Sequence, residues 1–339
     1  MKPKSEGRRL WWRLLRLRLL RLRLRLKVGV ASRLANMCSP TPRGSNAGSS
    51  QVMVSPWVDM SEYPLPDLTS YASSTGHTVY TLSGISSCMG APAWAGVVPL
   101  DVVAPQVRAL QQLGGGVAVV FGGPNGIDLA LELDSECLAR HYGTVIKQYA
   151  PCILAFDLFG HDDPVMCRTR AAALARVQQQ QSRTDWQTMA CVEATPTGVA
   201  DMAALRVFEE SGARVDVVCL KAMNFGDAAA PNPVGRTMAW YVCQAALHAQ
   251  CQLLDAGMTY ATVGVCFMAG VNDVESEVVT VRDAREIAEF AALAPWMTYV
   301  GYWSVNRDRD DGRRGATTIS SGIAQRPFAF VRALKKYAA

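Results

Sequence analysis

The chain has 339 residues, half of them hydrophobic, and carries a formal net charge of +5. That apolar content can bury a core, so the composition excludes a wholly disordered chain. The charge is uneven: residues 1–50 hold 13 Lys and Arg against one Glu, which leaves 21 basic and 28 acidic residues, a net charge of −7, for the remainder. Phosphate binding needs clustered Lys and Arg, so the acidic body argues against a nucleic-acid partner.

Residues 8–27 consist almost wholly of Arg, Leu and Trp. Arginines interrupt every candidate hydrophobic core of a secretory signal, and a helix here would carry charge around its whole circumference. Three interpretations stay open: an Arg-rich organellar presequence, a tail that binds membranes or nucleic acid, and low-complexity sequence upstream of the true start. We favour the third, because Met37 and the Pro/Ser/Gly-rich residues up to Ser50 suit a start site or a linker. We therefore expect residues 1–50 to be a disordered extension and 51–339 to be the folded domain.

From residue 51 onward, short apolar runs alternate with longer helix-like segments, which is typical of parallel strands joined by crossover helices. The expected strands are residues 52–60, 78–85, 116–121, 152–158, 188–194, 215–223, 261–268 and 299–304. The expected helices are residues 102–113, 136–149, 165–181, 202–211, 238–256, 282–293 and 327–337. Eight strands predict an α/β fold of one domain, a (β/α)8 TIM barrel with its functional sites at the carboxyl ends of the strands. A doubly wound open sheet is the alternative, but no Gly-x-Gly-x-x-Gly follows the first strand.

The ten cysteines stand singly, with no Cys-x-x-Cys pair, so the sequence predicts neither a metal site nor a cofactor. Cys152, Cys191, Cys219 and Cys266 lie inside apolar strand-like runs, where a thiol behaves as a small buried hydrophobe. We expect free thiols rather than a disulfide framework. Unpaired cysteines and the lack of a secretory signal favour an intracellular location, although the sequence leaves the location open. No run of about 18 uncharged apolar residues is present, so we expect no transmembrane segment.

Residues 150–160 read Ala-Pro-Cys-Ile-Leu-Ala-Phe-Asp-Leu-Phe-Gly. This run resembles the catalytic strand of glycoside hydrolase family 18, the chitinase family, whose pattern is Asp-x-x-Asp-x-Asp-x-Glu followed by Gly. The four acidic positions of that pattern are here Cys152, Ala155, Asp157 and Phe159. The position of the glutamate that protonates the glycosidic oxygen is thus a phenylalanine, which has no titratable proton and cannot act as a general acid.

Other motifs follow in the order that the family has them and cover nearly all of residues 51–339. They lie at residues 55–60, 92–96 (Pro-x-Trp-x-Gly), 121–126, 196–198, 270–273, 303–308 (Trp-Ser-x-Asn-Arg-Asp) and 321–327. Any one motif is weak, but seven in order make the resemblance to bacterial-type chitinases specific. The chain departs from the family at Val120, where the family has serine, and in residues 221–225, where Asn224 and Phe225 replace the Asp and Tyr of Met-x-Met-Asp-Tyr.

The resemblance implies substrate-assisted cleavage of an N-acetylated sugar, in which the strand-four Glu is the acid and the preceding Asp orients the acetamido group. Only Asp157 keeps its position in this chain. Losing the acid, the inner aspartate and the tyrosine together usually abolishes turnover. We therefore expect no catalytic residue, and the degenerate positions are Ala155, Asp157, Phe159, Asn224 and Phe225.

The resemblance also implies a substrate-binding site at the carboxyl-terminal mouth of the barrel, on Asp157, Asn224 and Trp303. Each residue has an alternative interpretation. Asp157 could be a buried polar residue bonded to Asn224, and Trp303 could fill the core. Phe225 and Phe159 could fill the pocket or make it apolar. Glu193, which ends the fifth strand, is expected to be a surface or salt-bridged carboxylate rather than a relocated acid.

Three hypotheses about function follow from the sequence. The first is an inactive chitinase-like barrel that binds a chitin-type oligosaccharide or serves as a scaffold for a protein partner. The alternative is an active glycoside hydrolase on chitin-like substrates with displaced catalytic residues. The third is a structural protein with a collapsed pocket. The identity of the ligand, the true start site and the oligomeric state lie beyond the sequence.

Overall fold

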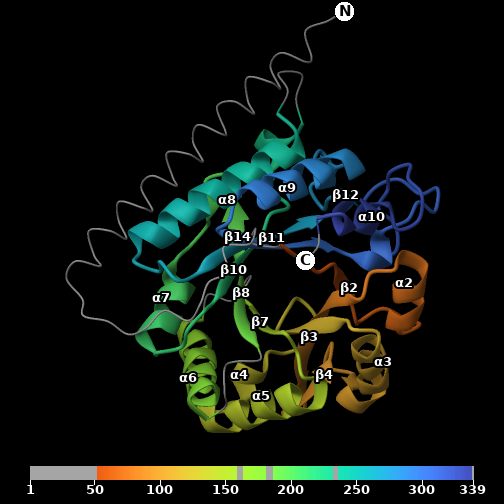
Figure 1. Ribbon diagram of the computed structural model, residues 1–339. Coiled ribbons are helices and arrows are strands. Elements are labelled where there is room, and N and C mark those ends of the chain that lie inside the picture. The colour runs from red at the N-terminus through yellow and green to blue at the C-terminus, as the bar shows by residue number, and fades with distance from the viewer. Residues whose placement is uncertain (1–51, 159–162, 181–185, 232–235, 338–339) are drawn as a thin grey trace, which may run out of the picture.

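The computed structural model describes residues 52–158, 163–180, 186–231 and 236–337. The extension 1–50 and Phe159 lie outside the described residues, so what the sequence predicts for them stays a prediction. The described chain forms a ring of parallel strands with helices around its outside (Figure 1).

Eight strand positions close the barrel, and every neighbouring pair around the ring is parallel. They are β1 Met53–Val54 with β2 Trp57–Asp59, β3 Val79–Cys88, β6 Gly116–Phe121, β7 Ile153–Asp157, β8 Gln187–Thr195, β10 Val217–Lys221, β11 Thr262–Met268 and β14 Met297–Trp303. Since β1 pairs with β14 and β2 with β3, the first strand position joins the two ends of the sheet. The predicted α/β TIM barrel is therefore confirmed.

The first expected strand is interrupted at Pro56. The amide of Ser55 donates to Val300 O of β14, whereas the amide of Thr81 on β3 donates to Pro56 O. Proline has no N–H to give to a ladder, so the strand changes partner there. One run of sequence thus supplies two short strands that face opposite neighbours.

The principal helices lie outside the barrel, as Figure 1 shows. They are α2 Leu68–Thr75, α3 Leu100–Gln112, α5 Ser135–Tyr149, α6 Pro164–Gln180, α7 Ala203–Glu210, α8 Met238–Asp255, α9 Val281–Leu293 and α10 Ala329–Lys335. A short α4, Leu129–Glu132, precedes α5. The sequence did not predict α2, because this helix is mostly polar and buries little more than Leu68, Ala72 and Thr75.

Short antiparallel segments, also unpredicted, extend the carboxyl ends of three strands. They are β4 Ala91–Trp94 and β5 Val98–Pro99 after β3, β9 Gly198–Val199 after β8, and the hairpin of β12 Gly270–Val271 with β13 Val278–Val279 after β11. Each pairing is only two to four residues long, too short for a period in the sequence. These segments surround the barrel mouth.

Side chains of the strands alternate between two apolar clusters. On β7, Ile153 and Ala155 point into the barrel interior, whereas Leu154 and Phe156 pack against the outer helices. The next inward position on β7 is Asp157, at the mouth. This alternation, which strands impose on successive residues, decides which polar residues can meet inside the ring.

The nine cysteines in the described part are free thiols, and Cys191, Cys219 and Cys266 are buried in the barrel interior. Burial raises the pKa of Cys219 and Cys266, so both are held as neutral thiols. Among the described residues, no group of His, Cys, Asp or Glu is arranged to hold a metal ion. None of the helices described there is long and apolar enough to cross a membrane.

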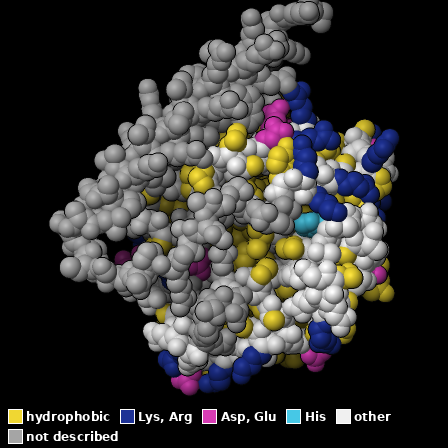
Figure 2. Space-filling view, in the orientation of Figure 1, with side chains coloured by type: hydrophobic (Ala, Val, Ile, Leu, Met, Phe, Trp, Pro, Cys, Tyr) yellow, Lys and Arg dark blue, Asp and Glu magenta, His cyan; other side chains and the backbone are white. Residues whose placement is uncertain are grey.

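Figure 2 shows how charge is spread over one face of the molecule. Basic side chains lie on one side and along the lower edge of that face, and hydrophobic and polar side chains lie between them (Figure 2). The absence of a nucleic-acid partner stays a prediction.

Candidate functional site

The mouth of the barrel holds a buried ion pair that sequence analysis missed. Lys221 Nζ at the end of β10 donates to Asp157 Oδ2 at 2.8 Å, and the two side chains are 17% and 1% exposed. Burial alone would lower the pKa of Lys221, but the charge of Asp157 and the hydrogen bond from it outweigh burial and raise that pKa. The lysine is therefore held as a cation, and the aspartate has a charged partner.

Strand register explains how these two residues meet. Asp157 is level with Cys191 on β8, which is level with Cys219 on β10, so Lys221 lies one inward layer nearer the mouth. The flexible four-carbon stem of lysine lets its ammonium reach back to the aspartate. A signal existed in the sequence: Lys221 is a lone charge ending an apolar strand, two residues after the inward Cys219.

A second buried ion pair supports Asp157 from behind. Arg170 of α6 forms an ion pair with Asp128 and donates from its Nη1 atom to the backbone oxygen of Asp157 at 3.2 Å. Gly122 makes room for this guanidinium, since a Cβ there would lie 3.1 Å from it and the backbone has φ +83°. Gly122 and Gly123 both have positive φ, a backbone conformation that favours glycine at this strand exit.

Asp157 is buried, as its alternative interpretation has it, but among the described residues Asn224 does not bond to it, so the partner named in that interpretation was wrong. Asn224 Nδ2 donates to Asp273 Oδ2 at 2.8 Å, and its Oδ1 accepts from the amide of Val274 at 3.3 Å. The residue is exposed and lies in left-handed backbone conformation with φ +55°. Its side chain links the loop after β10 to the β12–β13 hairpin.

Glu277, which sequence reasoning also missed, holds the same two loops together. Its carboxylate is buried and accepts from the amide of Gly226 at 2.7 Å. Burial raises the pKa of Glu277, against the hydrogen bonds from backbone amides of residues 224–226 that lower it. Nothing in the sequence marks this glutamate, because its partners are backbone amides of a distant loop.

Trp303 ends β14 and is half-buried. Its ring stands edge-on to Trp57 inside the barrel, with 6.2 Å between ring centroids, and packs on the interior apolar cluster. Part of its surface remains open at the mouth. This placement suits both expectations for it, a floor under a sugar ring and a filler of the core.

The replaced residues lie in different surroundings. Ala155 is buried in the barrel interior, one inward layer below Asp157 on β7. Phe225 is half-buried and packs on the outer cluster between barrel and helices rather than in the interior. Asp157, Asn224 and Trp303 come to one end of a closed barrel, but within the described residues no hydrogen bond joins any two of them.

Glu193 is the next inward residue on β8 after Cys191. It is opposite Lys221 in register and is exposed. Within the described part of the chain, its carboxylate has no hydrogen bond or ion pair. The exposure expected for Glu193 is thus confirmed, and the residue lies inside the barrel mouth. That it is not a relocated acid stays a prediction.

Comparison with known proteins decides what this barrel is similar to. No family model matches the chain. It is 27% identical over 283 residues to a probable bifunctional chitinase/lysozyme of Escherichia coli, and 26% identical over 274 residues to endochitinase 11 of Metarhizium anisopliae. These matches cover 76% and 75% of the chain but only 31% and 52% of those proteins. The chain therefore spans a third to a half of the curated relatives it matches.

A solved chitinase structure matches a larger share of this chain and nearly all of its own. Catalytic-site mutants of active domain 2 of the thermostable chitinase of Pyrococcus furiosus, complexed with chito-oligosaccharides, superpose with a TM-score of 0.75 at 27% identity. The match covers 87% of this chain and 97% of that one. The chain has the chitinase-type fold of glycoside hydrolase family 18. In this chitinase-type barrel the mouth carries the Asp157–Lys221 pair on its wall, with Trp303 across from it at the end of β14.

Proposed function

We propose that this barrel binds N-acetylglucosamine-type sugars at its mouth without hydrolysing them. The observation that carries the proposal is the ion pair of Lys221 with Asp157. By resemblance, Asp157 matches the aspartate that orients the acetamido group in family-18 enzymes. Here one of its oxygens accepts from an ammonium instead.

The residue types around this pair support a loss of catalysis. Position 159 is a phenylalanine in the sequence, and its side chain has no proton to give to a leaving oxygen. Ala155 presents only a methyl group at the inner acidic position, inside an apolar cluster. An isolated general acid is worth about 10²–10⁴-fold in rate. We therefore expect turnover to be absent.

Sugar binding is supported by Trp303. A half-buried aromatic ring at the mouth offers an apolar face on which a sugar ring can stack. The related Pyrococcus chitinase domain is described as complexed with chito-oligosaccharides. The fold alone would not assign a ligand, because function depends on the site.

The test pairs a binding isotherm with a turnover assay on the full chain. We expect chito-oligosaccharides to bind at millimolar concentration or tighter, with no release of product from a fluorogenic chitobioside. Sustained release that is lost in Asp157→Ala would instead support an active hydrolase with displaced groups. If no chito-oligosaccharide binds at millimolar concentration, with or without its acetyl groups, a protein-interaction scaffold replaces the sugar proposal.

A further inference from the structure

Glu193 is an exposed carboxylate on an inward-facing strand position. Along β8, Met189 and Cys191 belong to the interior cluster, whereas Ala190 and Val192 belong to the outer cluster. Strand alternation therefore directs Glu193 into the barrel mouth. Cys191 below it is completely buried and Glu193 is exposed, so the mouth is open to solvent at this level.

The negative charge of Glu193 is not neutralised by its neighbour on β10. Its register neighbour on β10 is Lys221, whose ammonium is bonded to Asp157 at 2.8 Å. Since that pair is neutral as a unit, it adds little attraction for an anion. Within the described residues Glu193 takes part in no ion pair, so its carboxylate is a net negative charge on this wall.

The opposite side of the mouth does not offset this charge. Asp59 at the end of β2 is the inward residue after Trp57, and in the described part its carboxylate accepts hydrogen bonds only from the amide and hydroxyl of Ser61. Arg307, behind the end of β14, is enclosed by backbone carbonyls to which it donates. Of the acidic residues Asp59, Asp157 and Glu193, only Glu193 is exposed to a ligand, and the cations Lys221 and Arg307 are already engaged.

We propose that Glu193 selects a protonated amino group on the ligand, so that the mouth prefers sugars carrying a free 2-amino group. Such sugars are the glucosamine units of partly deacetylated chitin chains. This inference rests on the proposed sugar-binding function and names the ligand class. A carboxylate and a sugar ammonium form a charge-assisted hydrogen bond, and neutral acetamido groups cannot do so with the same strength.

The test compares two tetramers by calorimetry on the full chain, one of N-acetylglucosamine and one of glucosamine, at a mildly acidic pH that keeps the amines protonated. We expect the wild type to bind the glucosamine tetramer more tightly. Glu193→Gln should lower the affinity ratio of glucosamine to N-acetylglucosamine tetramer by about fivefold, the scale of a partly exposed charge pair. The effect should shrink at high salt because the carboxylate is exposed.

Glu210→Gln on α7 is the matched control, since it removes the same charge from an exposed site on the outer helix layer. An equal change of the ratio in this control would overturn the inference, because bulk charge would then explain it. Binding of the N-acetylated tetramer with a ratio that Glu193→Gln leaves unchanged would overturn the inference and keep the proposed function. Binding of the glucosamine tetramer alone, lost in Glu193→Gln, would support the inference and overturn the proposed N-acetylglucosamine site. Binding of neither tetramer would overturn both.

Discussion

Two groups of polar residues at the barrel mouth differ in the kind of partner to which they bond. After β14, the side chains of three successive residues, Asn306, Arg307 and Asp308, bond to neighbouring segments, and most of their partners are backbone groups. On the wall formed by β7, β8 and β10, the polar residues are Asp157, Glu193 and Lys221, and their partners are side chains or solvent. We call the first group the anchor and the second the wall.

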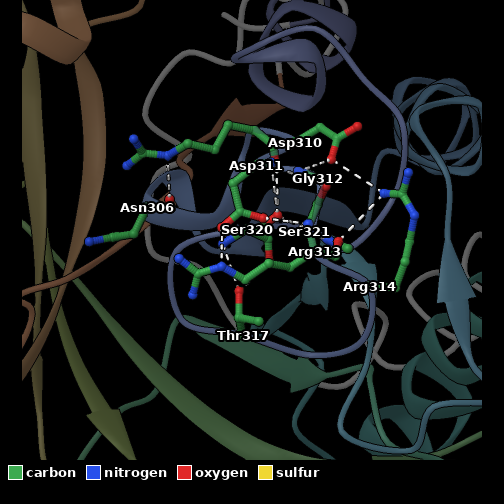
Figure 3. A network of polar contacts seen from close by, with 11 residues as sticks. Asn306, Asp310, Asp311, Gly312, Arg313, Arg314, Thr317, Ser320 and Ser321 are labelled. Carbon is green, nitrogen blue, oxygen red and sulfur yellow. Dashed lines mark hydrogen bonds and ion pairs between the residues drawn. The ribbon is translucent and has the colours of Figure 1, made fainter.

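The anchor binds several segments to the end of the barrel. Asn306 Oδ1 accepts from the amide of Asp59 at 2.9 Å, and its Nδ2 donates to the oxygen of the same residue at 3.1 Å. Burial lowers the pKa of Arg307 to about 10. Arg307 stays a cation at neutral pH and donates to the backbone oxygens of Thr317, Ala269 and Val271. The loop that follows, with its turns at Asp310–Arg314 and Thr317–Ser321, is drawn in Figure 3.

The comparison explains which family motifs the chain retains. By the resemblance, Asn306-Arg307-Asp308, Gly270 and Gly322 keep the family pattern. The first three bond to neighbouring segments, and the two glycines serve backbone geometry: a Cβ at Gly270 would lie 1.9 Å from Ser321 O, and one at Gly322 2.4 Å from Gly315 O. The positions that differ from the family, 155, 159, 224 and 225, are those to which the resemblance assigns chemistry. This contrast supports the proposal that the chain keeps the scaffold of the family without its chemistry.

The largest effect should come from breaking the anchor at Asp308. Its carboxylate is fully buried and accepts from Tyr302 OH, Gln325 Nε2 and the amides of Phe330 and Val331 at 2.7–3.1 Å. Asp308→Ala should lower the free energy of unfolding by about 4 kcal/mol, because four donors lose a buried acceptor. Chemical denaturation measures the loss.

Asp310→Ala is the control for the anchor. Asp310 accepts from the amide of Gly312 and pairs with exposed Arg314, so its removal should cost about 1 kcal/mol or less. Equal losses for Asp308→Ala and Asp310→Ala would contradict the difference we draw between buried anchor and surface turn.

The next effect tests the wall. Lys221→Met should lower the free energy of unfolding by about 3 kcal/mol, because it leaves the buried Asp157 carboxylate without its cation. Lys221→Met combined with Asp157→Asn should recover part of that loss, since the second change removes the uncompensated charge. Denaturant unfolding of the two single variants and the double variant gives the coupling energy. Additive losses would show that the two residues do not depend on each other.

Sequence patterns could predict the barrel but only part of this wall. Residues 116–121 are a strand in the prediction and in the structure, because a continuous apolar run is buried on both faces. The Lys221 partner could not be predicted, since it depends on the stagger between β7, β8 and β10, which no local pattern encodes. The α2 helix and the β12–β13 hairpin were missed because they bury few apolar residues.

A smaller effect is expected where the two regions meet, at Trp303. If its open face contacts a sugar, Trp303→Ala should weaken chito-oligosaccharide binding by about 1 kcal/mol, the scale of a specific aromatic contact. Trp240→Ala is the control, because Trp240 is also half-buried but lies on α8 in the outer layer. Isotherms on folded variants, checked by near-ultraviolet circular dichroism, measure the change. If Trp303→Ala and Trp240→Ala lose the same affinity, Trp303 does not contact the sugar and only fills the core.

The smallest effect should follow removal of residues 1–50, which belong to neither region. Barrel closure uses the pairing of Met53 with Tyr299 and of Val54 with Val300, so the described ring is complete from β1 onward. The removed segment carries 13 basic residues and one acidic residue, a composition poorly suited to burial in a core. We expect the melting temperature to change by no more than a few degrees, the shift that about 1 kcal/mol gives in a domain of this size. Calorimetry of the full and shortened chains measures it. Loss of cooperative unfolding in the shortened chain would mean that the extension contributes to the stability of the barrel, and the domain boundary at residue 51 would then be wrong.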